Sequence, residues 1–172
     1  MERLSSGDMV ATTQGALPPF ALYRPASVPE AVDCMRAAAA PAVFYAGGTD
    51  IFSKLRHGLR PASLIWLDRV AERTAAEAGE DTLTLGAGLT HAGAIAHPAL
   101  DAVPGLKDAW RRIATTRIRR HATLGGNLMA RHTRYELSIL FSALSATARL
   151  ATPAGERTMP VDDIWTLASD EP

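Results

Sequence analysis

Two Gly-Gly pairs, each flanked by a threonine and another polar residue, limit the possible folds of this chain more than any other sequence feature. The first lies in Ala46-Gly47-Gly48-Thr49-Asp50, and the second lies in Thr123-Leu124-Gly125-Gly126-Asn127. A phosphate needs several donors at close range, and backbone N–H groups supply them where glycine leaves out the Cβ. The first pair also follows a buried-strand pattern and precedes a helix, whose N-terminus is partly positive. Together the two pairs predict a cradle for a diphosphate.

A single Gly-Gly pair is more often a plain turn, so the prediction depends on finding two of them with similar neighbours. Neither pair matches the P-loop pattern G-x-x-x-x-G-K-[ST] or the dinucleotide fingerprint G-x-G-x-x-G. Gly86-Ala87-Gly88 comes nearest to the fingerprint, but no third glycine follows at the required spacing. These spacings disfavour a Rossmann-type dinucleotide site.

Hydrophobic periodicity and turn residues predict an irregular alternation of short strands and helices, which is typical of an α+β fold rather than a doubly wound sheet. Residues 1–17 are predicted to be a flexible lead-in, and residues 18–172 to be one domain. Hairpins are expected around residues 79–81 and 153–155. Strands are predicted at 20–23 (an edge strand), 42–46 and 64–67, and helices at 27–39, 50–57, 90–97, 105–113, 116–120 and 135–144.

The charge balance excludes several classes of function. Lys+Arg and Asp+Glu number 18 each, so no bulk attraction to nucleic acid or to a membrane is expected. The single cysteine, Cys34, cannot form an internal disulfide or a four-thiolate metal site. No signal-peptide pattern is present, and no apolar run approaches the ~20 residues that span a bilayer. We therefore predict a cytoplasmic protein.

No residue is predicted to act in catalysis or to bind a metal. The five histidines lack a metal-binding spacing such as H-E-x-x-H, and neither a Ser-His-Asp set nor a paired-carboxylate geometry can be argued. A basic cluster precedes the second Gly-Gly pair, and it is either a solvated helix face or, through Arg117 or Arg119, a support for phosphates or a partner surface. It contains no interleaved aromatic residues, so nucleic acid is not an expected ligand. The cluster comprises Arg111, Arg112, Arg117, Arg119, Arg120 and His121.

Three stretches in this order and spacing resemble the FAD-binding subunits of molybdenum hydroxylases. They are 45–50 (Tyr-Ala-Gly-Gly-Thr-Asp), 85–91 (Leu-Gly-Ala-Gly-Leu-Thr-His) and 118–127, which ends in Thr-Leu-Gly-Gly-Asn. The family includes the FAD subunit of carbon monoxide dehydrogenase and the FAD domain of xanthine dehydrogenase. The resemblance covers roughly residues 20–164. It implies the two-lobed FAD-binding fold shared with vanillyl-alcohol oxidase, with an α/β lobe at about 18–70 and a larger α+β lobe at about 71–172.

The resemblance also implies which residues contact FAD. The family usually has an aspartate nine residues after the asparagine of the second loop, and this chain has Glu136 there. Ile113 falls where a family member places an apolar side chain against FAD. Family subunits continue into a flavin-contacting segment and a C-terminal domain, which are expected to be missing from a chain that ends at Pro172. The implied cofactor-binding residues are Phe44, Tyr45, Ala46, Gly47, Gly48, Thr49, Asp50, Ile51, Ile113, Thr123, Gly125, Gly126, Asn127 and Glu136.

In this family, substrate is oxidised at a molybdenum cofactor on a large partner chain, and electrons pass through two 2Fe-2S clusters on a small partner to FAD and then to an external acceptor. The resemblance therefore implies an electron-transfer flavoprotein unit that binds FAD, with both partners on separate chains. Two alternatives stay open from the sequence. One is a degenerate or truncated scaffold with weak or no FAD binding, and the other is a module for a nucleotide such as ATP or NAD.

Overall fold

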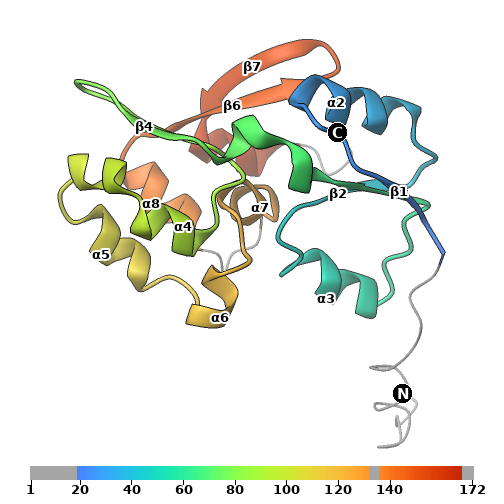
Figure 1. Ribbon diagram of the computed structural model, residues 1–172, viewed down its shortest axis with the longest axis horizontal. Coiled ribbons are helices and arrows are strands. Elements are labelled where there is room, and N and C mark those ends of the chain that lie inside the picture. Colours follow the sequence, from blue (N-terminus) through green and yellow to red (C-terminus); the bar gives the residue numbers. More distant parts are fainter. Residues whose placement is uncertain (1–18, 132–135, 168–172) are drawn as a thin grey trace, which may run out of the picture.

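The computed structural model of the chain describes residues 19–131 and 136–167. The lead-in predicted at residues 1–17 lies outside these residues, as does the stretch 133–135 in front of Glu136. The described elements mix short helices with three separate small sheets, so the predicted α+β class is confirmed (Figure 1). Within the described part of the chain, no helix is both long and apolar enough to cross a membrane.

A three-stranded parallel sheet forms the N-terminal part of the fold. Its strands are β1 (Ala21–Tyr23), β2 (Ala42–Tyr45) and β3 (Ser63–Trp66), in the order β1-β3-β2, so β1 is an edge strand as predicted. Strand β3 pairs with β2 from Ala42 opposite Ser63 to Tyr45 opposite Trp66. Because all three strands run in the same direction, the segment that leaves β2 and the segment that leaves β3 emerge at one edge of the sheet.

Helix α2 (Val28–Ala37) connects β1 to β2, and its start follows from the predicted capping box. The Ser27 side chain accepts a hydrogen bond from the Glu30 N–H at 3.3 Å, and the Glu30 carboxylate accepts one from the Ala26 N–H at 2.7 Å. Helix α3 (Ile51–Arg56) connects β2 to β3. Strand β2 therefore leads through the first Gly-Gly pair directly into α3.

The rest of the described chain contains two antiparallel hairpins, β4 (Ala76–Ala78) with β5 (Leu83–Leu85), and β6 (Thr147–Thr152) with β7 (Gly155–Pro160). Both hairpins were predicted, but the first is shorter than expected because residues 71–74 form a 3-10 turn. A 3-10 turn at 98–102 was not predicted. The helices of this part are α4 (His91–Ala96), α5 (Leu106–Arg111), α6 (Thr116–Arg119), α7 (Leu124–Met129) and α8 (Leu137–Ala143).

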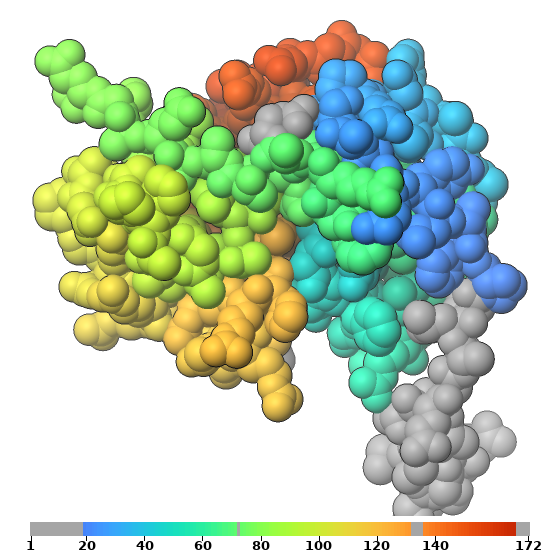
Figure 2. Space-filling model, viewed as in Figure 1, coloured from blue at the N-terminus to red at the C-terminus, as the bar shows by residue number. Residues whose placement is uncertain are grey.

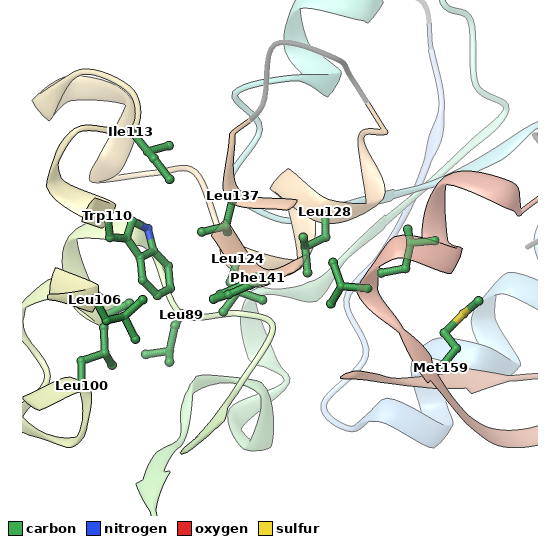
Figure 3. Close-up of a cluster of buried hydrophobic side chains, with 13 residues drawn as sticks. Leu89, Leu100, Leu106, Trp110, Ile113, Leu124, Leu128, Leu137, Phe141 and Met159 are labelled. Carbon is green, nitrogen blue, oxygen red and sulfur yellow. The ribbon is translucent and has the colours of Figure 1, made fainter. Parts of the chain in front are cut away.

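The hydrophobic core lies among these short helices and the β6–β7 hairpin (Figure 3). Trp110 is fully buried, and its ring meets Phe141 edge to face with centroids 5.4 Å apart. The Trp110 indole N–H donates to Nδ1 of His91 at 3.0 Å, which joins α5 to α4. Leu124 and Leu128 place one face of α7 against the same core. The core thereby fixes the helix that carries the second Gly-Gly pair.

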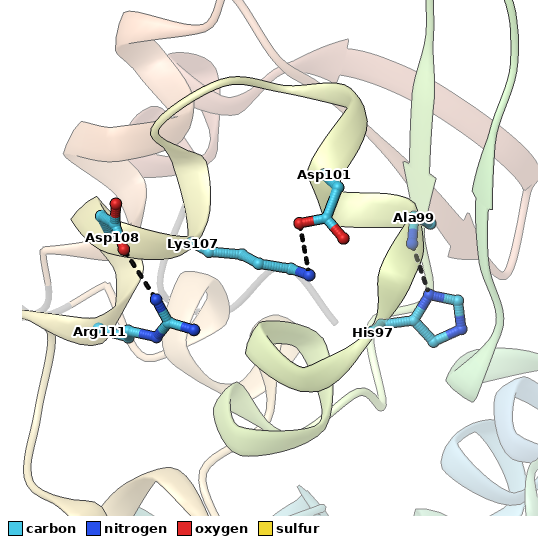
Figure 4. A network of polar contacts seen from close by, with 6 residues as sticks. All are labelled: His97, Ala99, Asp101, Lys107, Asp108 and Arg111. Atoms are coloured by element: carbon cyan, nitrogen blue, oxygen red, sulfur yellow. Dashed lines mark hydrogen bonds and ion pairs between the residues drawn. The ribbon is translucent and has the colours of Figure 1, made fainter.

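Polar contacts on the outer surface tie α5 to the turn before it (Figure 4). Lys107 of α5 pairs with Asp101 at 2.7 Å, and Arg111 pairs with Asp108 at 2.7 Å within α5. The Ala99 N–H donates to Nδ1 of His97 at 3.2 Å. Arg111 belongs to the basic cluster of residues 111–121, and its charge is engaged locally on this surface.

Candidate functional site

The first Gly-Gly pair forms a tight connection between β2 and α3. Gly48 adopts the left-handed region with φ of 78°, which favours glycine, and its carbonyl accepts the Phe52 N–H at 3.0 Å to open the helix. Gly47 faces a different demand, because a Cβ there would lie 1.8 Å from the carbonyl oxygen of His121. The two glycine segments are therefore in direct contact. Glycine is required at 47 by this close approach within the protein, and not by the approach of a ligand as predicted from the sequence.

The second Gly-Gly pair is the first turn of α7 rather than a loop. Thr123 is the N-cap, and its hydroxyl oxygen accepts the Gly126 N–H at 3.2 Å. The N–H groups of the next residues donate within the protein: Leu124 to the Leu89 carbonyl at 2.9 Å, and Gly125 to the Ala87 carbonyl at 2.7 Å. These two backbone donors are therefore engaged within the protein, in contrast to the expectation that backbone N–H groups of this segment are open to a ligand.

Side chains supply the polar groups that the second segment can offer to a ligand. The Thr123 oxygen already accepts a hydrogen bond, so its own O–H can donate elsewhere. The side-chain oxygen of Asn127 is buried and has no hydrogen-bond partner among the described residues. Gly125 packs against the 86–88 turn, since a Cβ there would lie 2.8 Å from that of Ala87. Polar chemistry at this segment thus comes from Thr123 and Asn127.

The two segments enclose a cleft of about 480 Å³. Helices α3 and α6 lie on its two sides and face each other across a notch at the lower edge of the molecule (Figure 2). Twelve of the predicted site residues line it: Phe44, Ala46, Gly47, Gly48, Thr49, Asp50, Ile51, Ile113, Thr123, Gly126, Asn127 and Glu136. Tyr45 and Gly125 were predicted to contact the cofactor but are not among the lining residues.

Tyr45 supports the first Gly-Gly pair from behind. Its phenol group lies so close to Gly48 that a Cβ there would be 2.4 Å from the phenol oxygen. The Tyr45 ring meets Trp66 edge to face at 5.9 Å, and the Arg24 guanidinium lies 4.4 Å from the centroid of Trp66. Arg24 also forms an ion pair with Asp68, and its hydrogen bond holds the pKa of Asp68 below the ordinary value. Arg24, Trp66 and Tyr45 thus form a continuous row of contacts from the parallel sheet to the turn at Gly48.

Seven residues that line the cleft were not predicted from the sequence. Lys54 could have been found, because it lies four residues after Asp50 on the same helix face, and the two side chains pair at 2.8 Å. This pair places a cation in the cleft beside a predicted ligand residue. The other six residues lie near predicted site residues in the sequence, but none of them belongs to a motif that predicts contact with a cofactor. The missed residues are Lys54, Ala114, Thr115, Ile118, Ala122, Met129 and Ala130.

Apolar side chains in the cleft remain exposed to solvent. Phe44, Ile118 and Met129 are 41%, 38% and 46% exposed, although all three line the concave surface. A ligand with a large apolar face would bury them, at about 25 cal/mol for each Å² removed from water. The cleft therefore combines glycine turns and hydroxyl groups with a surface suited to an aromatic ring system.

The basic cluster at 111–121 does not contribute directly to this cleft, since none of its members is among the described lining residues. Arg111 is paired with Asp108. The Arg119 side chain turns inward, where it hydrogen-bonds carbonyl groups between α5 and α6. Support for phosphates was predicted for Arg117 or Arg119, and the Arg119 guanidinium is engaged with these carbonyl groups instead.

Comparison with known proteins identifies the family. The family model described as "FAD binding domain in molybdopterin dehydrogenase" matches residues 18–171. The chain belongs to this family. Its cofactor is FAD, and the resemblance noted in the sequence is confirmed.

Relatives of this FAD-binding domain are components of larger enzymes. The carbon monoxide dehydrogenase medium chain of Hydrogenophaga pseudoflava is 31% identical over 151 residues, which cover 86% of this chain and 52% of the relative. The nicotine 6-hydroxylase medium subunit of Paenarthrobacter nicotinovorans is 29% identical over 163 residues, covering 90% and 57%. The domain thus spans about half the length of these relatives.

Solved structures agree on the fold. Carbon monoxide dehydrogenase from Hydrogenophaga pseudoflava matches with a TM-score of 0.81 and 28% identity, over 86% of this chain and 52% of that chain. Quinoline 2-oxidoreductase from Pseudomonas putida 86 matches with a TM-score of 0.80 and 29% identity, over 87% and 53%. The predicted FAD-binding fold is therefore confirmed for this domain.

The residues of the cleft fit FAD in their chemistry. Asn127 presents a buried acceptor that lacks a partner among the described residues, and ribityl hydroxyl groups are donors that match it. The Thr123 hydroxyl and the turn at Gly47–Gly48 offer small polar groups of the kind that accommodates a diphosphate. Exposed Phe44 and Met129 offer apolar surface. The FAD-binding domain thus presents a polar region and an apolar region in one cleft.

Proposed function

We propose that this chain is the FAD-binding electron-transfer unit of a molybdenum-containing hydroxylase or dehydrogenase. It receives electrons from iron–sulfur clusters on a small partner chain, whose own source is a molybdenum-cofactor large subunit, and it delivers them to an external acceptor. Bound FAD supplies the redox chemistry, and the chain supplies binding, orientation and electrostatics. Relatives named as medium chains or medium subunits support an assembly with a larger and a smaller partner. The chain's location is proposed to be the cytoplasm.

The cleft between the two glycine segments is the observation that carries this proposal. We assign the diphosphate of FAD to the turn at 47–50 together with the Thr123 hydroxyl. Asn127 and Glu136 take the ribityl and ribose hydroxyl groups, and the apolar side chains take the ring systems. Lys54 offsets the negative charge of Asp50, which would otherwise oppose the diphosphate at close range. Tyr45 and Gly125 hold the two segments and do not contact the cofactor.

The direct test is flavin binding by the purified chain. An absorbance spectrum shows whether flavin co-purifies, and a fluorescence titration with added FAD gives the dissociation constant. Saturable one-to-one binding supports the proposal. A colourless protein that takes up no added FAD contradicts it and favours the scaffold alternative. A thermal shift with ATP or NAD in the absence of an FAD effect favours the module for another nucleotide.

Gly126→Val is expected to abolish FAD retention in a folded protein. A side chain at 126 projects into the cleft, and its Cβ would lie 2.8 Å from the Thr123 hydroxyl oxygen. Gly93→Val is the matched control, because Gly93 stands three residues after its N-cap, Thr90, as Gly126 stands three residues after Thr123, and its Cβ would lie 3.1 Å from the Thr90 hydroxyl oxygen. Gly93 lies outside the cleft, so only the Gly126 variant should lose FAD in the titration. Equal affinities in the two variants would show that the second segment does not contact FAD.

A further inference from the structure

The connection between α5 and α6 forms one wall of the cleft and adopts a strained conformation. Ile113, Ala114 and Thr115 all line the cleft. Ala114 has φ of 58°, in the left-handed region that non-glycine residues adopt only when their surroundings hold them there. The segment therefore requires contacts that keep this conformation.

Arg119 supplies those contacts. Its Nη1 lies 2.7 Å from the Ala114 carbonyl oxygen and 3.1 Å from the carbonyl oxygens of Ile113 and Arg111. Its Nη2 donates to the Thr116 hydroxyl at 3.1 Å, and its backbone N–H donates to the Thr115 carbonyl at 2.9 Å. The Arg119 side chain thus hydrogen-bonds three carbonyl groups at and after the end of α5, together with the hydroxyl of Thr116, the first residue of α6.

We propose that Arg119 is a positioning residue for FAD binding: it holds the wall Ile113–Thr115 in the conformation that completes the cleft. This inference rests on the function proposed above. Arg119 is not among the described residues that line the cleft, so it acts through the wall and not by contact with the cofactor. Lysine cannot replace it, because a single ammonium group lacks the planar fork that reaches both the carbonyl cluster and the Thr116 hydroxyl.

Arg117 provides a matched control on the same helix. It is exposed, and within the described part of the chain its guanidinium has no hydrogen bond or ion pair. Arg119→Ala and Arg119→Lys are each expected to raise the dissociation constant for FAD about tenfold or more, as expected when several hydrogen bonds from a charged donor are lost. Arg117→Ala is expected to leave the constant unchanged. The readout is fluorescence titration of the purified chain.

Two further measurements separate positioning from general stability. Hydrogen exchange of the FAD-free chain should become faster in a peptide covering 111–116 in the Arg119 variants, and stay unchanged in β3. Guanidinium chloride, added well below the concentration that unfolds the protein, should restore FAD affinity to Arg119→Ala. It should not change the affinity of Arg117→Ala.

The outcomes separate this inference from the proposed function. If the unaltered chain binds no FAD, the proposed function fails, and the exchange pattern still decides whether Arg119 holds the 111–116 segment. If the unaltered chain and both Arg119 variants bind FAD equally, the positioning role is wrong and the proposed function stands. Faster exchange throughout the chain, without rescue by guanidinium, would assign Arg119 to overall stability and overturn the inference.

Discussion

At Gly47 two distant parts of the chain come close enough to exclude any side chain. The His121 carbonyl occupies the place of a Cβ, while at Gly48 the positive φ and the Tyr45 phenol make the same demand for a different reason. The sequence pattern indicated that both positions require glycine. It could not distinguish a glycine that lets a ligand approach the backbone from one that lets another part of the protein pack against it. The contacts of Arg119 could not be predicted at all. Its guanidinium bonds carbonyl groups whose positions depend on the path of the 111–116 segment, and no sequence motif indicates that path.

Gly47→Ala is expected to push the two glycine segments apart. Overpacking of this kind costs about 1–3 kcal/mol, so the free energy of unfolding in urea should fall and the dissociation constant for FAD should rise. Gly155→Ala is the control. It lies in the β6–β7 hairpin with φ of 120° and open space around its Cβ position, so it carries backbone strain without a clash.

The control should lose about 1 kcal/mol of stability and keep the FAD affinity of the unaltered chain. If Gly47→Ala also kept full affinity despite a comparable loss of stability, contact between the segments would not be needed for the cofactor site.

Short elements whose ends carry clear signals were predicted well. Ser27 and Thr90 cap their helices as expected, and both hairpins form. The second Gly-Gly pair was predicted as a loop that cradles a phosphate, and two glycines disfavour a helix interior by about 1 kcal/mol each. Packing of Leu124 and Leu128 in the core offsets this cost and makes the segment the first turn of α7. Tertiary packing therefore overrode local propensity at the element that carries half of the proposed site.

The contact between α4 and α5 should make stability depend on pH. His91 is fully buried, and burial, followed by the nearby Arg119 charge, lowers its pKa from 6.5. Its Nδ1 accepts the Trp110 N–H, so the neutral ring is the form that fits. The unfolded chain takes up a proton near pH 6.5 while the folded chain does not, so stability is fully present above that pH and is lost as pH falls below it.

Urea unfolding at several pH values between about 5 and 8 measures this slope. His91→Asn keeps an acceptor near the position of Nδ1 and does not titrate. In this variant the free energy of unfolding is expected to decline much less below pH 6.5 than in the unaltered chain, whatever its value at neutral pH. An unchanged slope in this variant would assign the pH dependence to other groups.

At the scale of the whole molecule, the cleft is assembled from segments that are far apart in the chain. One side comes from the sheet edge and α3, and the other comes from the α5–α6 connection and α7 (Figure 1). The division into lobes near residues 70 and 71 stays a prediction. A ligand that contacts both sides is expected to stabilise them together.

FAD should therefore raise the unfolding midpoint in a concentration-dependent way. At a free concentration of 100 times its dissociation constant, the expected gain is about 2.7 kcal/mol. Hydrogen exchange with and without FAD should show protection at both 44–51 and 113–127. Protection confined to one of these segments would contradict a shared site, and riboflavin, which lacks the diphosphate, is a suitable comparison ligand.

The helix caps, the hairpins, the α+β class and the two glycine segments could be predicted from the sequence, because these features depend on interactions within a few residues. Twelve of the fourteen residues that the family resemblance implied as FAD contacts line one cleft, and their contact with FAD stays a prediction. The folded structure was needed to show that the His121 carbonyl lies against Gly47 and that Tyr45 and Gly125 are not among the residues that line the cleft. It was also needed to show that the Arg119 guanidinium hydrogen-bonds the Ile113 and Ala114 carbonyls. These contacts join residues whose proximity is set by core packing, and packing is a property of the folded chain as a whole.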